Sequence, residues 1–144
     1  MSTPHVTPLK VRFNELDPYG HVNHAQYVSY FEHARTEALE SIGLPMDQMA
    51  AKGVQVVVME MTVAYKLPAV AGDELEIDTW ISQLRRASTI WEQRIRRGDE
   101  LCVTLNVRAG VTDTNGRPMR PPTWLFDSLE ALTLSPGPEA ESRS

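Results

Sequence analysis

The segment NELDPYGHVN, residues 14–23, gathers three side chains that could do acid–base or nucleophilic chemistry: Glu15, Asp17 and His21. An ionised carboxylate can attack a carbonyl carbon or activate a water molecule, and an imidazole can carry a proton near neutral pH. The simplest interpretation is a plain connection, because Asp-Pro favours a turn and a glycine relieves a bend. The segment is nevertheless richer in ionisable groups than a turn requires.

The residues after this loop predict a helix of about five turns that begins after Asn23. Asn23 is a favourable N-cap, Gly43 can adopt the left-handed conformation past the last turn, and Pro45 cannot continue the helix. The first N–H groups of a helix lack intrahelical partners and lie at its positive end, where an oxyanion would be stabilised. One helix face is apolar, at steps of four, three, four and four, through Tyr27, Phe31, Ala34, Ala38 and Ile42.

A train of strands follows the helix. These segments are rich in Val, Ile, Thr and Tyr or alternate between apolar and polar residues, and the turns between the last three are too short for parallel neighbours. In one of them Leu75, Ile77 and Thr79 share a face, with Glu76 and Asp78 on the other. The expected strands are residues 9–13, 54–67, 73–84, 88–97 and 101–112, with a short helix at 46–51 and a terminal helix at 121–132.

A strand, a long helix and four further strands in succession predict the α+β class and not the alternating α/β class. The helix has one apolar face and the strands need a cover, so the economical packing curls an antiparallel sheet around the helix. A chain of 144 residues suits one domain, here residues 1–134. Residues 1–8 are expected to be a loose leader, and residues 135–144 a flexible C-terminal tail, because they offer little to bury.

The stretch VRFNELDPYGHVNHAQYVSYFEHAR, residues 11–35, resembles the hotdog-fold acyl-CoA thioesterases of the 4-hydroxybenzoyl-CoA thioesterase type. That family's signature is D-x-x-G-h-V followed by a helix with a Tyr-rich face, and AYKLPAVAGDELEI at 64–77 fits the same fold. The resemblance implies an antiparallel sheet of about five strands wrapped around one long helix, and hydrolysis of acyl-CoA to free acid and CoA. It also implies a homodimer or homotetramer with active sites at the dimer interface.

The resemblance also assigns roles within the loop. Asp17 falls on the family's catalytic carboxylate, as nucleophile or general base, and His24 falls where a backbone N–H polarises the thioester carbonyl. Both roles agree with the chemistry, since thioester hydrolysis needs a nucleophile or base and donors for the oxyanion. Gly20 and Asn23 of the same motif, and Tyr27 one turn further along the helix, are expected to contact the substrate.

Three alternatives stay open. Many relatives carry Asp two residues before the catalytic one, where this chain has Glu15, so Glu15 is a second candidate carboxylate. A hydratase or dehydratase acting on an acyl thioester would favour a catalytic histidine, for which His21 is the candidate. A non-catalytic acyl-thioester binding module would use Asp17 only as a turn residue.

A basic segment, residues 85–97, holds five arginines and one acidic residue. It is either the solvated rim of a hairpin or a binding site for the phosphates of CoA, which an acidic protein would otherwise repel. Arg85 and Arg86 are the candidates for this contact.

Composition excludes several other classes. A net charge of −5 argues against nucleic-acid binding, which depends on a basic surface, and no apolar run approaches the ~20 residues of a membrane span. The single cysteine, Cys102, is expected in the core and leaves no disulfide framework. Asp17, His21 and His24 could ligate a metal only if both imidazoles converged across the helix start, so no metal is expected, and no glycine-rich motif indicates a nucleotide cofactor. The cytoplasm is the expected location.

Overall fold

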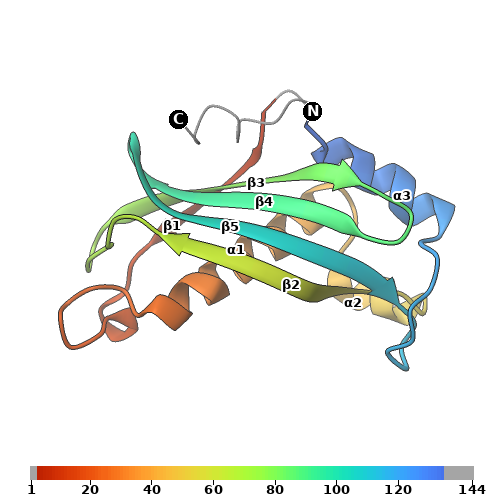
Figure 1. Ribbon diagram of the computed structural model, residues 1–144, viewed down its shortest axis with the longest axis horizontal. Helices are drawn as coiled ribbons and strands as arrows, with labels where there is room; N and C mark the ends of the chain where they lie inside the picture. Colours follow the sequence, from red (N-terminus) through yellow and green to blue (C-terminus); the bar gives the residue numbers. More distant parts are fainter. Residues whose placement is uncertain (1–2, 135–144) are drawn as a thin grey trace.

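The protein forms one antiparallel sheet that arches over a long central helix (Figure 1). The structure is a computed structural model and describes residues 3–134, so the predicted tail at 135–144 lies outside the described residues. Its elements are β1 (His5–Lys10), the 3-10 helix η1 (Phe13–Glu15), α1 (His24–Ser41), α2 (Met46–Ala51), β2 (Gln55–Tyr65), β3 (Glu74–Leu84), β4 (Thr89–Arg97), β5 (Glu100–Thr112), α3 (Thr123–Leu129) and the 3-10 helix η2 (Glu130–Leu132).

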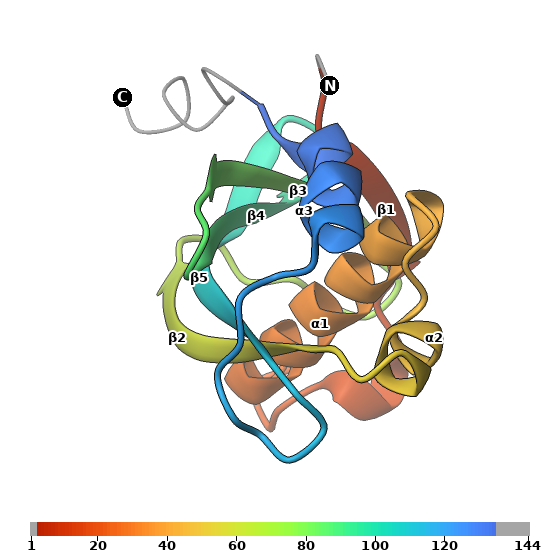
Figure 2. The ribbon, with the colours of Figure 1, turned by 90° about the vertical axis from the view of Figure 1, so that its right-hand side faces the viewer.

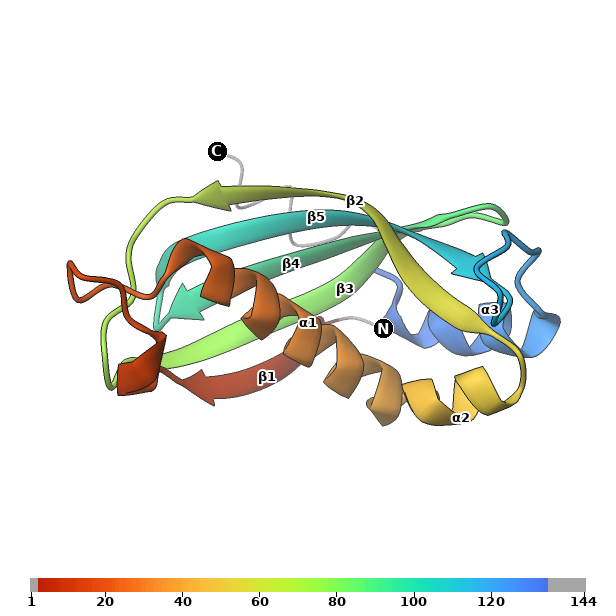
Figure 3. The ribbon, with the colours of Figure 1, turned by 90° about the horizontal axis from the view of Figure 1, so that it is seen from below.

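The five strands follow the order β1-β3-β4-β5-β2, and every neighbouring pair is antiparallel. The prediction of an antiparallel sheet curled around one helix is confirmed, and the fold is the hotdog fold (Figures 1 and 2). In the described part of the chain, β1 and β2 are the two edge strands. Figure 3 shows α1 lying across the concave side of this sheet.

The core lies between α1 and the concave face of the sheet. Four of the five apolar positions predicted for the inner helix face are buried, and Ile42, the fifth, is the C-cap residue at the rim. Gly43 takes a φ of 79° directly after, as expected for the residue that ends the helix. Opposite the helix, the strands bury the side chains that alternate towards it, among them Ile77, Ile81, Trp91, Ile95, Val103, Leu105 and Val107.

One polar residue joins the helix to the middle of the sheet. The Gln93 side chain, buried on β4, donates hydrogen bonds to the Phe31 carbonyl at 3.0 Å and to Thr79 Oγ1 at 2.9 Å, and it accepts one from Arg35 at 2.8 Å. These contacts establish which face of β3 and β4 meets α1. Asp78, adjacent to Thr79 on β3, therefore lies on the opposite, outer face of the sheet.

The first strand begins earlier in the chain than the sequence predicts, so that prediction is wrong. The predicted strand covers residues 9–13 after a loose leader, but β1 is His5–Lys10, and Phe13 already belongs to η1. Pairing with β3, from His5 opposite Thr79 to Lys10 opposite Glu74, orders these residues although Pro8 is a poor strand former. Proline is tolerated there because β1 is an edge strand.

The C-terminal helix falls within the expected residues 121–132, as α3 followed by η2, and buries Leu125, Leu129 and Leu132. The chain then runs along β3, where Leu134 N–H donates to the Ile81 carbonyl at 3.1 Å. Cys102 is buried in the core as expected. No helix within residues 3–134 has both the length and the apolar character needed to cross a bilayer.

Candidate active site

The loop between η1 and α1 is folded as a small hairpin with Asp17 at its base. The Asp17 N–H donates to the His21 carbonyl at 2.7 Å, and the Gly20 N–H donates to the Asp17 carbonyl at 3.0 Å. Leu16 and Val22 form an isolated antiparallel bridge one step further out. Gly20 has a φ of 78°, which a side chain would strain, so a glycine suits this turn.

The Asp17 carboxylate is held through one of its two oxygens. Oδ1 accepts hydrogen bonds from the N–H groups of Tyr19 at 2.9 Å and His21 at 3.1 Å. Within residues 3–134, no hydrogen-bond partner is found for Oδ2. The side chain is half-buried, so its direction is fixed by the loop while one oxygen is left for a substrate or a water molecule.

The start of α1 lies directly after this loop. Asn23 caps the helix as predicted, because its Oδ1 accepts a hydrogen bond from Ala25 N–H at 2.9 Å. His24 is the first helical residue; its imidazole is exposed, and among the described residues no acceptor is found for its N–H. Its carbonyl accepts a hydrogen bond from Tyr65 Oη at 3.0 Å, so the end of β2 fixes the start of α1.

A second loop, residues 66–73, lies beside the first and shapes the site. The Val22 N–H donates to the Ala69 carbonyl at 2.8 Å, and His21 forms an isolated antiparallel bridge with Val70. Tyr27, only 3% exposed, accepts a hydrogen bond from Ala69 N–H at 3.0 Å through its phenol oxygen. Burial raises the pKa of Tyr27, and the negative charge of Asp17 adds to this effect, so the phenol stays protonated beside loop 14–23.

Loop 66–73 is itself stabilised by an ion pair that was not predicted from the sequence. Asp73 Oδ2 accepts hydrogen bonds from Val70 N–H at 2.9 Å and from Arg97 Nη1 at 2.8 Å. The same Arg97 nitrogen donates to the Pro68 carbonyl at 3.1 Å. A local signal existed, since Asp73 follows Gly72 in a turn, but its partner is distant in sequence. Arg97 therefore serves the architecture of the site.

Glu15 does not share the position of Asp17. Its side chain is buried beneath the loop and accepts hydrogen bonds from Arg12 and from Tyr30 of α1. Arg12 and Tyr30 occupy both carboxylate oxygens, so the structure separates the two loop carboxylates into one buried and one half-buried group.

The five arginines of the basic segment fall into three groups, and Arg97, with its partner Asp73, is the first. Arg94 and Arg96 both pair with the buried Asp78 on the outer face of the sheet, so these two are internal ion pairs. Arg85 and Arg86 are exposed in the β3–β4 turn, which lies at the opposite end of the sheet from loop 14–23 (Figures 1 and 3). A single chain therefore does not bring these two arginines to Asp17.

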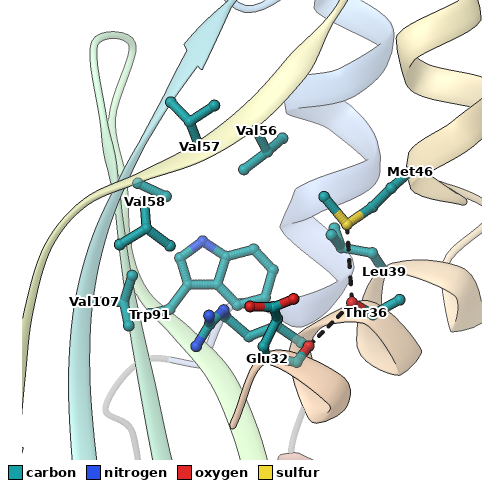
Figure 4. A pocket seen from close by; sticks show the side chains of 11 residues that line it. Glu32, Thr36, Leu39, Met46, Val56, Val57, Val58, Trp91 and Val107 are labelled. Atoms are coloured by element: carbon teal, nitrogen blue, oxygen red, sulfur yellow. Dashed lines mark hydrogen bonds between the residues drawn. The ribbon is translucent and has the colours of Figure 1, made fainter. Parts of the chain in front are cut away.

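Near that opposite end, Arg86 and Arg120 border an open groove of ≈ 500 Å³ whose floor includes Val57, Met59 and Met119. A second, mainly apolar cavity of ≈ 260 Å³ lies between α1 and β2 (Figure 4). Its walls hold Leu39, Met46, Val56, Val57, Val58, Trp91, Val107 and Ala109, with Glu32, Arg35 and Thr36 on the helix side.

The described residues contain no group of three or more His, Cys, Asp and Glu side chains arranged to hold a metal ion. His21 and His24 are both exposed, and the backbone of His21, not its ring, holds Asp17. The arrangement can instead present one carboxylate oxygen and one free backbone N–H at a helix N-terminus. A nucleophile or base and an oxyanion donor are the two groups that attack on a carbonyl carbon requires.

Comparison with known proteins defines the class. The model of the thioesterase-like superfamily matches residues 11–130, and the chain belongs to this family. It is 41% identical over 88 residues to the acyl-CoA thioester hydrolase YbgC of Escherichia coli O6:H1. This match covers 61% of the chain and 66% of YbgC, just under two thirds of that relative.

Two further relatives support the same class. The long-chain acyl-CoA thioesterase FadM of Escherichia coli is 38% identical over 89 residues, covering 62% of the chain and 67% of FadM. The crystal structure of a probable thioesterase from Bartonella henselae superposes with a TM-score of 0.78 at 31% identity, covering 83% of this chain and 99% of that one.

Proposed function

We propose that this protein hydrolyses acyl-CoA thioesters to the free acid and CoA. Asp17 is the nucleophile or general base, and the His24 N–H is the oxyanion donor. The observation that carries the proposal is that, among the described residues, neither Asp17 Oδ2 nor the His24 N–H at the start of α1 has a hydrogen-bond partner, and that Asp17 lies in the loop that leads directly into α1. The names of the relatives YbgC and FadM support the substrate class.

Two routes fit these groups. In the first, an Asp17 oxygen adds to the carbonyl carbon, the C–S bond breaks and CoA leaves as a thiolate that takes up a proton. Water then cleaves the acyl–aspartyl anhydride, which releases the acid and regenerates the carboxylate. In the second, Asp17 removes a proton from water as the water attacks, and the proton passes to the departing sulfur. In both, the His24 N–H stabilises the negative oxygen of the tetrahedral intermediate.

The active unit is proposed to be a homodimer or a homotetramer. The exposed edge of β2 carries the apolar side chains Val58 and Met59, which are 45% and 53% exposed, and an uncovered edge of this kind favours pairing with another strand. A twofold axis would pair two β2 strands antiparallel, so the Tyr65 end of one strand would lie beside the Gln55 end of the other. The exposed Arg85 and Arg86 of one copy would then approach the proposed catalytic loop, residues 14–23, of its partner.

Gly20, Asn23 and Tyr27 are proposed to border the reacting thioester, with Tyr27 acting through the loop that it holds. The acyl group is proposed to enter the apolar cavity between α1 and β2 of Figure 4, either in the same copy or across the β2 edge. At ≈ 260 Å³ this cavity is below the ~300–1,000 Å³ range of pockets for drug-sized ligands, which favours short or aromatic acyl groups over long chains.

The test is release of free thiol from a panel of short, long, branched and aromatic acyl-CoAs, with Asp17→Asn as the inactive reference. We expect thiol release by the wild type and a loss of at least about a hundredfold in kcat for the folded variant. No thiol release from any member of the panel would indicate a binding module, and hydration of enoyl-CoA without thiol release would indicate a hydratase. Near-normal turnover in Asp17→Asn would overturn the assignment of Asp17.

A further inference from the structure

Glu15 is a buried carboxylate that lies two residues before Asp17 and is only 6% exposed. Four donors from two residues surround it. Oε1 accepts from the Arg12 N–H at 2.9 Å and from Tyr30 Oη at 2.7 Å, while Oε2 accepts from Arg12 Nε at 3.1 Å and Nη2 at 2.7 Å. A buried charge is costly unless it is paired and hydrogen-bonded, and here both conditions are met.

The backbone of Glu15 closes the catalytic loop at the same point. Its carbonyl accepts a hydrogen bond from the N–H of Asn23, the cap residue of α1, at 2.9 Å. Asp17 and His21 form the next rung of the same small hairpin. Any shift of Glu15 therefore moves both the base of the loop and the start of the helix that carries His24.

The side chain of Glu15 connects this end of the loop to a buried residue of α1. Its partner Tyr30 lies in the second turn of α1, is 2% exposed, and packs edge-on against Tyr27 with ring centroids 6.0 Å apart. Tyr27 in turn holds Ala69 of the neighbouring loop. The two loops that border the site are thus linked through two adjacent tyrosines of α1.

We propose that Glu15 is a positioning residue for the hydrolysis. Its ionised carboxylate accepts hydrogen bonds from Arg12 and Tyr30 and so fixes the catalytic loop against α1. This contact orients Asp17 and the His24 N–H towards the same point. Glu15 does not touch the substrate, because its oxygens face Arg12 and Tyr30. The proposal rests on the function proposed above for Asp17. It also removes Glu15 from the role of second catalytic carboxylate.

The charge of Glu15 is essential to this role. A glutamine has one acceptor oxygen and an NH₂ group, so it cannot accept hydrogen bonds from four donors, and its amide would meet the Arg12 guanidinium donor to donor. Burial opposes ionisation of Glu15, but the hydrogen bonds from Arg12 and Tyr30 outweigh it and lower the pKa, so Glu15 is ionised at neutral pH.

The test compares kcat, KM and melting temperature for Glu15→Gln, Tyr30→Phe and a matched control, Asp78→Asn. Asp78 is also a buried carboxylate, 1% exposed and paired with two arginines, but it lies on the outer face of the sheet. We expect Glu15→Gln to lower kcat by about ten- to a hundredfold with KM for acyl-CoA nearly unchanged, because small displacements of a catalytic group cost this much. Asp78→Asn should lower the melting temperature and leave kcat unchanged.

Tyr30→Phe removes one hydrogen bond and keeps every charge, so it is the variant to use if Glu15→Gln does not fold. It should lower kcat several-fold, and less in the Glu15→Gln background than in the wild type, because the two share one contact. An unchanged kcat in either folded single variant, or equal losses of kcat in Glu15→Gln and Asp78→Asn, would overturn the proposal. Normal turnover in Asp17→Asn would instead refute the proposed function itself.

Discussion

The phenol oxygen of Tyr27 accepts a hydrogen bond from the backbone N–H of Ala69, and the carbonyl of the same alanine accepts one from Val22 N–H. A single side chain, one turn into α1, thus holds loop 66–73, and that loop holds the end of loop 14–23. The contact is buried, so neither group can turn to water if the other is lost.

Removing this acceptor should therefore loosen the site. We expect Tyr27→Phe to lower the free energy of unfolding by about 1–3 kcal/mol, the cost of leaving a buried N–H unpaired. Thermal melting and chemical denaturation would measure the loss. Tyr19→Phe is the matched control, because Tyr19 is 84% exposed and its substitution should change stability by less than about 0.5 kcal/mol. Equal stability of the two variants would show that the Ala69 contact contributes nothing.

His24 should act through its backbone and not through its exposed imidazole. His24→Ala keeps the N–H and should retain most of kcat, whereas His24→Pro removes the proposed oxyanion donor and should lose about a hundredfold or more. Proline is well tolerated at the first helical position, so circular dichroism should show both variants folded. Inactivity of a folded His24→Ala would instead assign the role to the imidazole.

Arg85 and Arg86 should affect binding of the CoA moiety and not the chemical step. Replacing both with Ala should raise KM for acyl-CoA far more than KM for the same acyl group on a small thiol, with kcat unchanged. Similar increases in KM for both thioesters would show that these arginines do not contact the CoA moiety.

Mixed oligomers would show in which copy these arginines act. Asp17→Asn chains and Arg85→Ala/Arg86→Ala chains should each be impaired alone. If the arginines serve the partner's loop, mixed dimers contain one site with an intact Asp17 and intact arginines, and a low KM should return. If the arginines serve their own loop, no site in the mixture is complete and KM should stay high.

Stability should fall at both ends of the pH range. Burial opposes ionisation of Glu15 and Asp73, but their hydrogen bonds outweigh it and lower both pKa values, so their contribution is present above the unfolded pKa of roughly 4 and is lost in acid. Burial raises the pKa values of Tyr27 and Tyr30, so their contribution is present below roughly pH 10 and is lost above it.

Melting temperature measured against pH should therefore show a plateau with a decline on each side. Glu15→Gln removes one of the titrating groups, so its melting temperature, although lower at neutral pH, should fall less steeply between about pH 5 and pH 3 than that of the wild type. An acid decline of equal steepness in both proteins would show that folding does not lower the pKa of Glu15.

The sequence by itself determined the parts that depend on local patterns. The spacing of apolar residues defined α1, Asn23 and Gly43 marked its ends, and the short turns required an antiparallel sheet from β3 to β5. The position of Asp17 ahead of a helix N-terminus was likewise legible, because a loop and the helix that it enters are contiguous in the chain. These features rest on hydrogen bonds and periodicities that span only a few residues.

Only the tertiary structure decided which distant groups meet. Pairing with β3 set the start of β1, and the packing of Tyr30 against the loop left the Glu15 side chain buried and hydrogen-bonded. The arginines of residues 85–97, alike in sequence, were separated by the fold into two partners of Asp78 on the outer face of the sheet, one partner of Asp73 in loop 66–73, and two exposed cations in the β3–β4 turn. The reason is physical: burial and charge pairing depend on side chains brought together from different strands, and no local pattern records those contacts.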